Sequence, residues 1–83
     1  MKKILYFTAT WCGPCTYVKP QLQEASNQIP ISFIDVDSNT TTTEKYNIKN
    51  IPAVVLIDNN GRELGRLVGS NVTKQSVIDL YNK

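Results

Sequence analysis

Apolar residues recur along this chain in short runs that are separated by polar segments. Four of these runs predict strands, and the first is rich in β-branched and aromatic residues. They span residues 3–8, 31–36, 53–57 and 63–68. Between the first two runs, apolar residues recur at the spacing of one helix face, as Val18, Leu22, Ala25 and Ile29. A strand, a helix and a strand in this order predict a right-handed parallel βαβ unit, so the fold class is α/β.

The remaining polar segments predict how the strands are joined. A threonine-rich stretch indicates a short helix that runs through Tyr46 and is capped by Thr42 or Thr43. The segment Asp58-Asn59-Asn60-Gly61 is typical of a hairpin turn between the last two strands. Residues 71–81 predict a closing amphipathic helix. Its inward side chains are expected to be Val77, Ile78 and Tyr81.

Composition and charge narrow the class of protein. Of the 83 residues, 41% are hydrophobic and 19% are charged, and no repeat or linker divides them, so we expect a single domain over residues 1–83. The formal charge of +2 comes from scattered Lys and Arg, which argues against nucleic-acid binding. No apolar stretch approaches the ~20 residues of a membrane span. The apolar run after Met1-Lys2-Lys3 is too short for a signal peptide.

The only two cysteines lie in the pentapeptide Trp11-Cys12-Gly13-Pro14-Cys15, between the first strand and the first helix. One helical turn is about 3.6 residues, so both thiols are expected at the same edge of the helix. Their Cα atoms can then lie within the roughly 4.4–6.8 Å that a disulfide tolerates. The spacing predicts a redox-active Cys12–Cys15 disulfide that opens and closes with little backbone movement.

Position within the motif distinguishes the two thiols. The unpaired N–H groups of the first helical turn stabilise a thiolate, so Cys12 is expected to be the exposed, low-pKa nucleophile. Cys15 lies one turn further into the helix and is expected to be the resolving cysteine, which attacks the mixed disulfide. Gly13 leaves room for a substrate backbone, and Pro14 suits a first helical turn. Trp11 is expected to support the site at its rim.

Two other uses of the cysteines have little support. A structural staple across so small a loop would contribute only about 2 kcal/mol. A structural zinc site normally needs four Cys or His ligands, and this chain has two cysteines and no histidine. We therefore expect no metal and no cofactor. With no further cysteines for structural bridges, a reducing cytoplasm is the expected compartment.

The motif and several other features resemble the thioredoxin family. W-C-G-P-C is the active-site sequence of that family, and Pro20 matches the proline that kinks its active-site helix. Residues 46–53 match its Y-x-I-x-x-I/V-P-T segment, and Gly61 and Val68-Gly69 match its last landmarks. The resemblance implies a minimal thioredoxin-like fold, a four-stranded mixed sheet flanked by helices. The usual N-terminal strand and helix are expected to be missing, which gives a glutaredoxin-sized protein.

The same resemblance implies a substrate-binding surface. The peptide bond before Pro52 is expected to be cis, which would aim the backbone groups of Ile51 outward beside Cys12. An extended substrate segment could then pair with Ile51 in the manner of strand addition. Trp11, Pro14, Ile51, Pro52 and Gly69 would together form a shallow apolar groove for protein disulfides.

One departure from the family concerns proton transfer. Thioredoxins usually carry a buried Asp six residues before the first cysteine, paired with a Lys on the neighbouring strand. Here Tyr6 and Phe33 occupy those two positions, so the sequence assigns no general base to Cys15. Asp35 lies on the same strand face as Phe33 and nearer the cysteines. It is either a substitute for the missing acid or a solvated carboxylate at a strand end.

Three functions are compatible with these features. The leading one is a protein-disulfide reductase, a monomeric enzyme re-reduced by a flavoenzyme of the thioredoxin-reductase type. A glutaredoxin-like protein would draw electrons from glutathione, but Gly13-Pro14 replaces the usual Pro-Tyr, and Val68-Gly69-Ser70 lacks the Gly-Gly-x-Asp pattern. A binding subunit could use the fold without redox turnover. The intact C-G-P-C favours the reductase.

Overall fold

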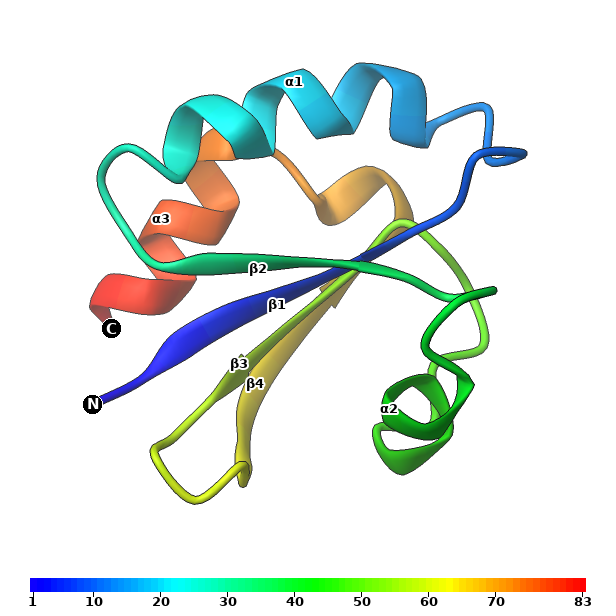
Figure 1. The fold of residues 1–83 in the computed structure, drawn as a ribbon. Helices are drawn as coiled ribbons and strands as arrows, with labels where there is room; N and C mark the ends of the chain where they lie inside the picture. The colour runs from blue at the N-terminus through cyan, green and yellow to red at the C-terminus, as the bar shows by residue number, and fades with distance from the viewer.

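The computed structural model describes residues 1–83 as four strands, three α-helices and one short 3-10 turn (Figure 1). In chain order these are β1 (Lys3–Thr8), α1 (Cys15–Ala25), β2 (Ile31–Asp35), α2 (Thr40–Lys45), β3 (Ala53–Ile57), β4 (Glu63–Val68), the 3-10 turn (Gly69–Asn71) and α3 (Lys74–Asn82). No helix is long and apolar enough to cross a membrane.

The strands form one mixed sheet in the order β2-β1-β3-β4. Strands β1 and β2 are parallel, as the βαβ prediction requires, and β1–β3 and β3–β4 are antiparallel. The register between β1 and β2 places Tyr6 beside Phe33 and Thr8 beside Asp35. The predicted four-stranded mixed sheet of an α/β fold is confirmed.

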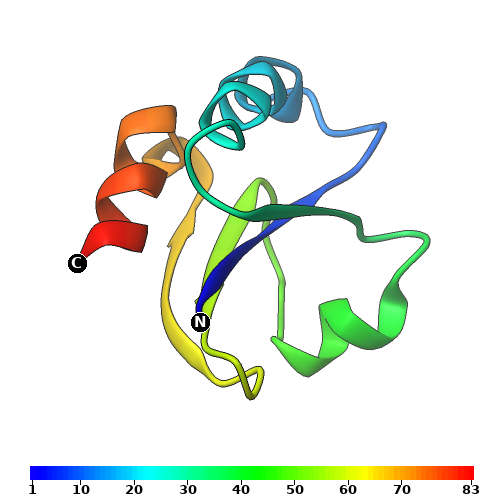
Figure 2. The ribbon, with the colours of Figure 1, turned by 60° about the vertical axis from the view of Figure 1, so that its left-hand side comes forward.

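Helices α1 and α3 cover one face of the sheet, and the short α2 lies against the other (Figures 1 and 2). Side chains of β1 alternate between these faces because successive residues of a strand point to opposite sides. The cluster under α1 and α3 contains Ile4, Tyr6, Val18, Leu22, Ile29, Val54, Leu56, Val72 and Val77. The cluster on the α2 side contains Leu5, Phe7, Tyr46, Ala53, Val55 and Ile57. Strands β1 and β3 are therefore buried on both faces.

The first helix buries the face that its sequence predicts. Val18, Leu22 and Ala25 are buried, whereas Pro20 lies inside the helix on its exposed side. Ile29 is also buried, although it follows the helix and belongs to the turn that leads into β2. An exposed polar face opposite one apolar face explains why α1 lies flat on the sheet.

The starts of the other two helices differ from the sequence prediction. Neither Thr42 nor Thr43 caps α2, because the helix begins earlier, with Asn39 at the N-cap. The predicted helix over residues 71–81 begins instead at Lys74, since the residues before it form the 3-10 turn. Thr73 and Ser76 form a reciprocal capping box there, in which each side chain accepts the backbone N–H of the other residue. Val77 is buried, and Ile78 and Tyr81 pack partly buried against the core, as predicted.

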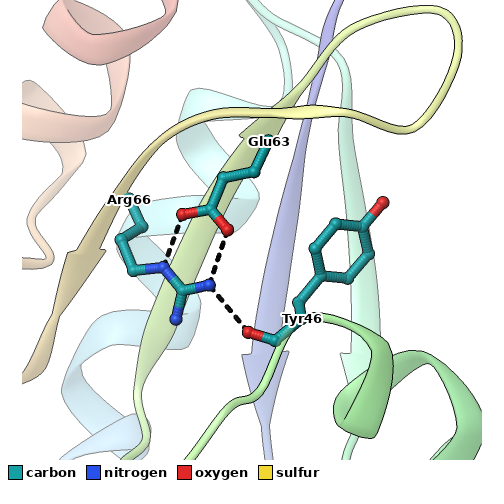
Figure 3. A network of polar contacts seen from close by, with 3 residues as sticks. All are labelled: Tyr46, Glu63 and Arg66. Carbon is teal, nitrogen blue, oxygen red and sulfur yellow. Dashed lines mark hydrogen bonds and ion pairs between the residues drawn. The ribbon is translucent and has the colours of Figure 1, made fainter.

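A polar network fixes the hairpin against the segment that leads to β3 (Figure 3). The Arg66 guanidinium pairs with both carboxylate oxygens of Glu63, at 2.6 and 2.7 Å, and donates to the carbonyl oxygen of Tyr46 at 2.7 Å. The Tyr46 hydroxyl donates to the carbonyl oxygen of Gly61 at 2.6 Å. Arg66 holds the pKa of Glu63 below its ordinary value, chiefly through the hydrogen bond. The network holds the start of the segment that carries Ile51 and Pro52.

Candidate active site

Cys12 lies in the loop between β1 and α1, and Cys15 is the first residue of α1, at the end of the sheet where β1 stops. They form a Cys12–Cys15 disulfide with 5.3 Å between their Cα atoms. The backbone N–H of Cys15 lies 3.3 Å from Cys12 Sγ, with hydrogen-bond geometry. Helix α1 begins at Cys15, with Pro14 at its N-cap. The first turn thus presents an N–H group to the sulfur of Cys12, an arrangement that stabilises negative charge there.

Exposure of the cysteines differs from the expectation. Cys12 was expected to be exposed, but it is 5% exposed and Cys15 is 3% exposed. Both pack against Ala9, with Val36 and Ile51 partly buried around them. Val36 and Ile51 come from two segments that are distant in sequence, so the sequence around the motif could not show them. In the disulfide form, the exposed residues of the motif are Trp11, Gly13 and Pro14.

Trp11 lies at the rim of the site and is 66% exposed. Its indole N–H donates to Asp37 Oδ2 at 2.8 Å, and the backbone N–H of Asp37 donates to Asp35 Oδ1 at 2.8 Å. Sequence analysis missed the role of Asp37. A signal was present, because parallel β1 and β2 end at the same edge of the sheet and Asp37 closely follows β2. The contact holds an exposed ring in one orientation beside the disulfide.

The segment before β3 meets the cysteines from the other side. The Ile51–Pro52 peptide bond is cis, and half-buried Ile51 packs against the cysteine cluster. Pro52 is fully buried, so its ring offers no surface to a substrate. The backbone N–H of Gly69 donates to the carbonyl oxygen of Pro52 at 2.8 Å. Gly69 has φ +64°, a conformation that favours glycine.

The two positions of the missing acid–lysine pair are filled by two aromatic rings in contact. Tyr6 is fully buried and meets Phe33 edge to face, with 5.5 Å between ring centroids. The Tyr6 hydroxyl has no hydrogen-bond partner. Burial raises the pKa of Tyr6 above its ordinary value; the nearby Thr8 hydroxyl opposes part of this shift without making a well-formed hydrogen bond. This part of the site is apolar and holds no group that ionises near neutral pH.

A groove of about 410 Å³ runs beside Cys15. Its lining residues are Thr8, Ala9, Thr10, Cys15, Thr16, Lys19, Phe33 and Asp35. A larger hollow, of about 680 Å³, lies at the opposite end of the sheet beside Lys3 and Asp58, and neither cysteine lines it. The smaller groove is the one that bears on the chemistry, because it reaches a cysteine.

A reversible two-cysteine disulfide at the start of a helix, at the edge of a mixed α/β sheet, defines a thiol–disulfide oxidoreductase. Comparison with known proteins specifies the family. The thioredoxin family profile matches residues 1–83. The thioredoxin of Mycoplasma genitalium is 35% identical over 82 residues, which cover 95% of this chain and 78% of that protein. The crystal structure of Schistosoma mansoni thioredoxin superimposes with a TM-score of 0.86 at 34% identity, covering 98% of this chain and 74% of that one.

A third relative carries a second activity in its name. The bifunctional thioredoxin reductase/thioredoxin of Mycobacterium leprae is 37% identical over 78 residues, covering 89% of this chain and 17% of that protein. The chain belongs to the thioredoxin family and is a thiol–disulfide oxidoreductase.

Proposed function

We propose that this protein reduces disulfides in other proteins, with Cys12 as the nucleophile and Cys15 as the resolving cysteine. The main observation in support is the position of the Cys12–Cys15 disulfide behind a rim formed by Trp11 and Pro14. The N–H of Cys15 points at Cys12 Sγ, which supports a thiolate on Cys12 rather than on Cys15. The proposed order of attack, Cys12 before Cys15, rests on this contact.

The reaction proceeds by two exchanges. In the reduced protein, the Cys12 thiolate attacks one sulfur of the substrate disulfide, forms a mixed disulfide and releases the other sulfur as a thiolate. Cys15 then loses its proton and attacks Cys12 Sγ. The Cys12–substrate bond breaks, the Cys12–Cys15 bond forms, and the second substrate sulfur leaves and is protonated. The substrate gains two electrons, which the dithiol loses.

Backbone groups beside the site support binding of an extended substrate segment. Ile51 lies outside every helix and strand, and neither its N–H nor its carbonyl oxygen makes a backbone hydrogen bond. A substrate strand could use both groups. Trp11 and Ile51 would supply the apolar contacts, whereas Pro52 and Gly69 would shape the backbone without touching the substrate through side chains.

The electron donor is proposed to be a flavoenzyme of the thioredoxin-reductase type. The Gly13-Pro14 dipeptide between the cysteines supports this donor over glutathione. The Mycobacterium leprae relative, whose name joins a thioredoxin reductase to a thioredoxin, adds support by analogy. A monomer working in a reducing cytoplasm fits this proposal, since both cysteines serve one reversible bond.

Reduction of insulin disulfides tests the proposal. Turbidity of the freed insulin chains would be followed with two electron supplies: NADPH with thioredoxin reductase, and NADPH with glutathione and glutathione reductase. Rapid turnover with the first supply and slow turnover with the second is expected. The reverse order would favour the glutaredoxin-like function. No turnover with either supply, or with dithiothreitol, would contradict a reductase and leave a binding subunit.

A further inference from the structure

Two neighbouring residue pairs on β1 and β2 lie on the sheet face that α1 covers. Tyr6 pairs with Phe33, and two residues further along, Thr8 pairs with Asp35. Residues two apart on a strand share a face. Tyr6 packs in the cluster under α1 and touches Phe33 edge to face, which identifies that face as the α1 side. The second pair therefore lies under the start of α1, where Cys15 is located.

The groove beside Cys15 contains one carboxylate and one cation. Asp35 is half-buried in its wall, and its Oδ1 accepts the N–H of Asp37, while Oδ2 has no partner within the protein. Lys19 lies one helical turn after Cys15, on the same side of α1. The Thr8 and Thr16 side chains complete a polar lining. Because Asp35 and Cys15 line the same groove, solvent that enters it can reach both the carboxylate and the thiol.

We propose that Asp35 accepts, through solvent in the groove, the proton that Cys15 loses when it attacks the mixed disulfide. The inference rests on the proposed function, and deepens it by assigning a proton acceptor to its second step. The Cys15 S–H bond breaks as the Cys15–Cys12 bond forms and the Cys12–substrate bond breaks. The proton passes to the Asp35 carboxylate and then to solvent or to the departing substrate thiolate, so protons and electrons balance.

The other groups that face Cys15 do not offer the same chemistry. From α1, Lys19 is a cation that favours a thiolate but accepts no proton while it is charged. From β1, Tyr6 is a buried neutral phenol whose pKa is raised by burial. After β2, Asp37 is bound to the indole of Trp11 and does not line the groove. Asp35 is the only carboxylate that does.

A purely electrostatic effect of Asp35 would have the opposite sign, which makes the proposal testable. A negative charge near a thiol disfavours the thiolate, so removing that charge would speed attack by Cys15. Removing a proton acceptor would slow it. Asp35→Asn separates the two effects, because the amide oxygen can still accept the N–H of Asp37 and preserve the local turn.

The experiment is stopped-flow reaction of the reduced protein with one equivalent of 5,5′-dithiobis(2-nitrobenzoate), followed by absorbance of the released thionitrobenzoate. The first release reports attack by Cys12 and the second reports attack by Cys15. In Asp35→Asn the second phase is expected to slow about a hundredfold at pH 7, the lower end of the range for loss of a general base. The first phase should stay within about twofold. Added formate, a small carboxylate that can enter the groove, should restore part of the lost rate.

Controls make each outcome decisive. Glu44→Gln removes an exposed carboxylate on α2, across the sheet, and should leave both phases unchanged. Thermal melting of oxidised Asp35→Asn should match the parent, which excludes a folding defect. A second phase that is unchanged or faster in Asp35→Asn would overturn the proposal. The proposed function is tested separately, by insulin reduction with the parent protein. The stopped-flow experiment measures the Cys15 step with a small disulfide and needs no protein substrate.

Discussion

The two adjacent pairs on β1 and β2 differ in how they meet water. Tyr6 meets Phe33 edge to face. Tyr6 is fully buried and its hydroxyl is unpaired, whereas Phe33 is 38% exposed. Thr8 and Asp35, two residues nearer the cysteines, line a groove that reaches Cys15. A charged group at Tyr6 would be buried and unpaired, whereas the half-buried carboxylate of Asp35 faces the groove. We therefore expect proton transfer at the pair Thr8–Asp35, which we call the open pair. The pair Tyr6–Phe33, which we call the closed pair, contributes packing.

Substituting either cysteine should have the largest effect on insulin reduction. The proposed role of the groove beside Cys15 requires that Cys15 reacts second. Cys12→Ser should abolish insulin reduction, since the remaining thiol is not the one that meets substrate. Cys15→Ser should retain the first exchange and accumulate a mixed disulfide with an insulin chain, detectable by mass spectrometry. Alkylation of the reduced parent that modified Cys15 before Cys12 would reverse the assignment and remove the role of the groove.

The second largest expected effect is a loss of stability when a charge is placed at Tyr6. Tyr6→Asp should destabilise the oxidised protein by about 4 kcal/mol, because it removes a buried ring and buries an unpaired carboxylate. The loss should be smaller at pH 4 than at pH 7, since a protonated carboxyl is less costly to bury. Thermal and urea unfolding would measure both values. A variant as stable as the parent would mean that this position is already wet.

The smallest expected effect is on stability, from a substitution that keeps Tyr6 and Phe33 in contact. Tyr6→Phe keeps the ring and removes only the unpaired hydroxyl, so it should stabilise the protein by about 1 kcal/mol in urea unfolding at pH 7. If Tyr6→Phe were less stable than the parent, the Tyr6 hydroxyl would have to make a hydrogen bond in solution, which would contradict an unpaired hydroxyl in the core.

The same substitution has a signature at high pH. The pKa of Tyr6 is raised by burial, so above about pH 10 the unfolded chain loses a proton that the folded chain keeps. Stability conferred by the neutral folded form is complete below pH 10 and falls as the pH rises toward the raised pKa. Tyr6→Phe removes this contribution, so its free energy of unfolding should fall less between pH 9 and pH 11 than that of the parent.

The sequence predicts the strands of this molecule better than its helix starts. Three strands have the predicted bounds, and β2 ends one residue earlier than predicted, because alternating or continuous apolar runs mark buried strands directly. The start of α3 depended on the turn at Gly69, whose positive φ is set by contact with the distant Pro52. The N-cap of α2 fell on Asn39, where several threonines offered equally plausible caps.

At the site, local spacing predicted geometry but not burial. The 5.3 Å between the Cα atoms of the two cysteines lies within the predicted range, although Cys12 precedes α1, which begins at Cys15. The burial of Cys12 was not predicted, since Val36 and Ile51 reach it from other segments. The ring pair was identified by position in the sequence, but its unpaired hydroxyl depends on packing in three dimensions. Likewise, the contact of Asp37 with Trp11 follows from the parallel register of β1 and β2.

The reduction potential of the Cys12–Cys15 pair tests most directly whether this protein is a disulfide reductase. The protein would be equilibrated with defined ratios of reduced and oxidised glutathione, and the dithiol fraction measured after acid quench and alkylation. The reductase account predicts a value near about −270 mV, which is typical of thioredoxin, so that electrons flow to most exposed protein disulfides. A value above about −200 mV would contradict it, because the pair would then act as an oxidant or isomerase.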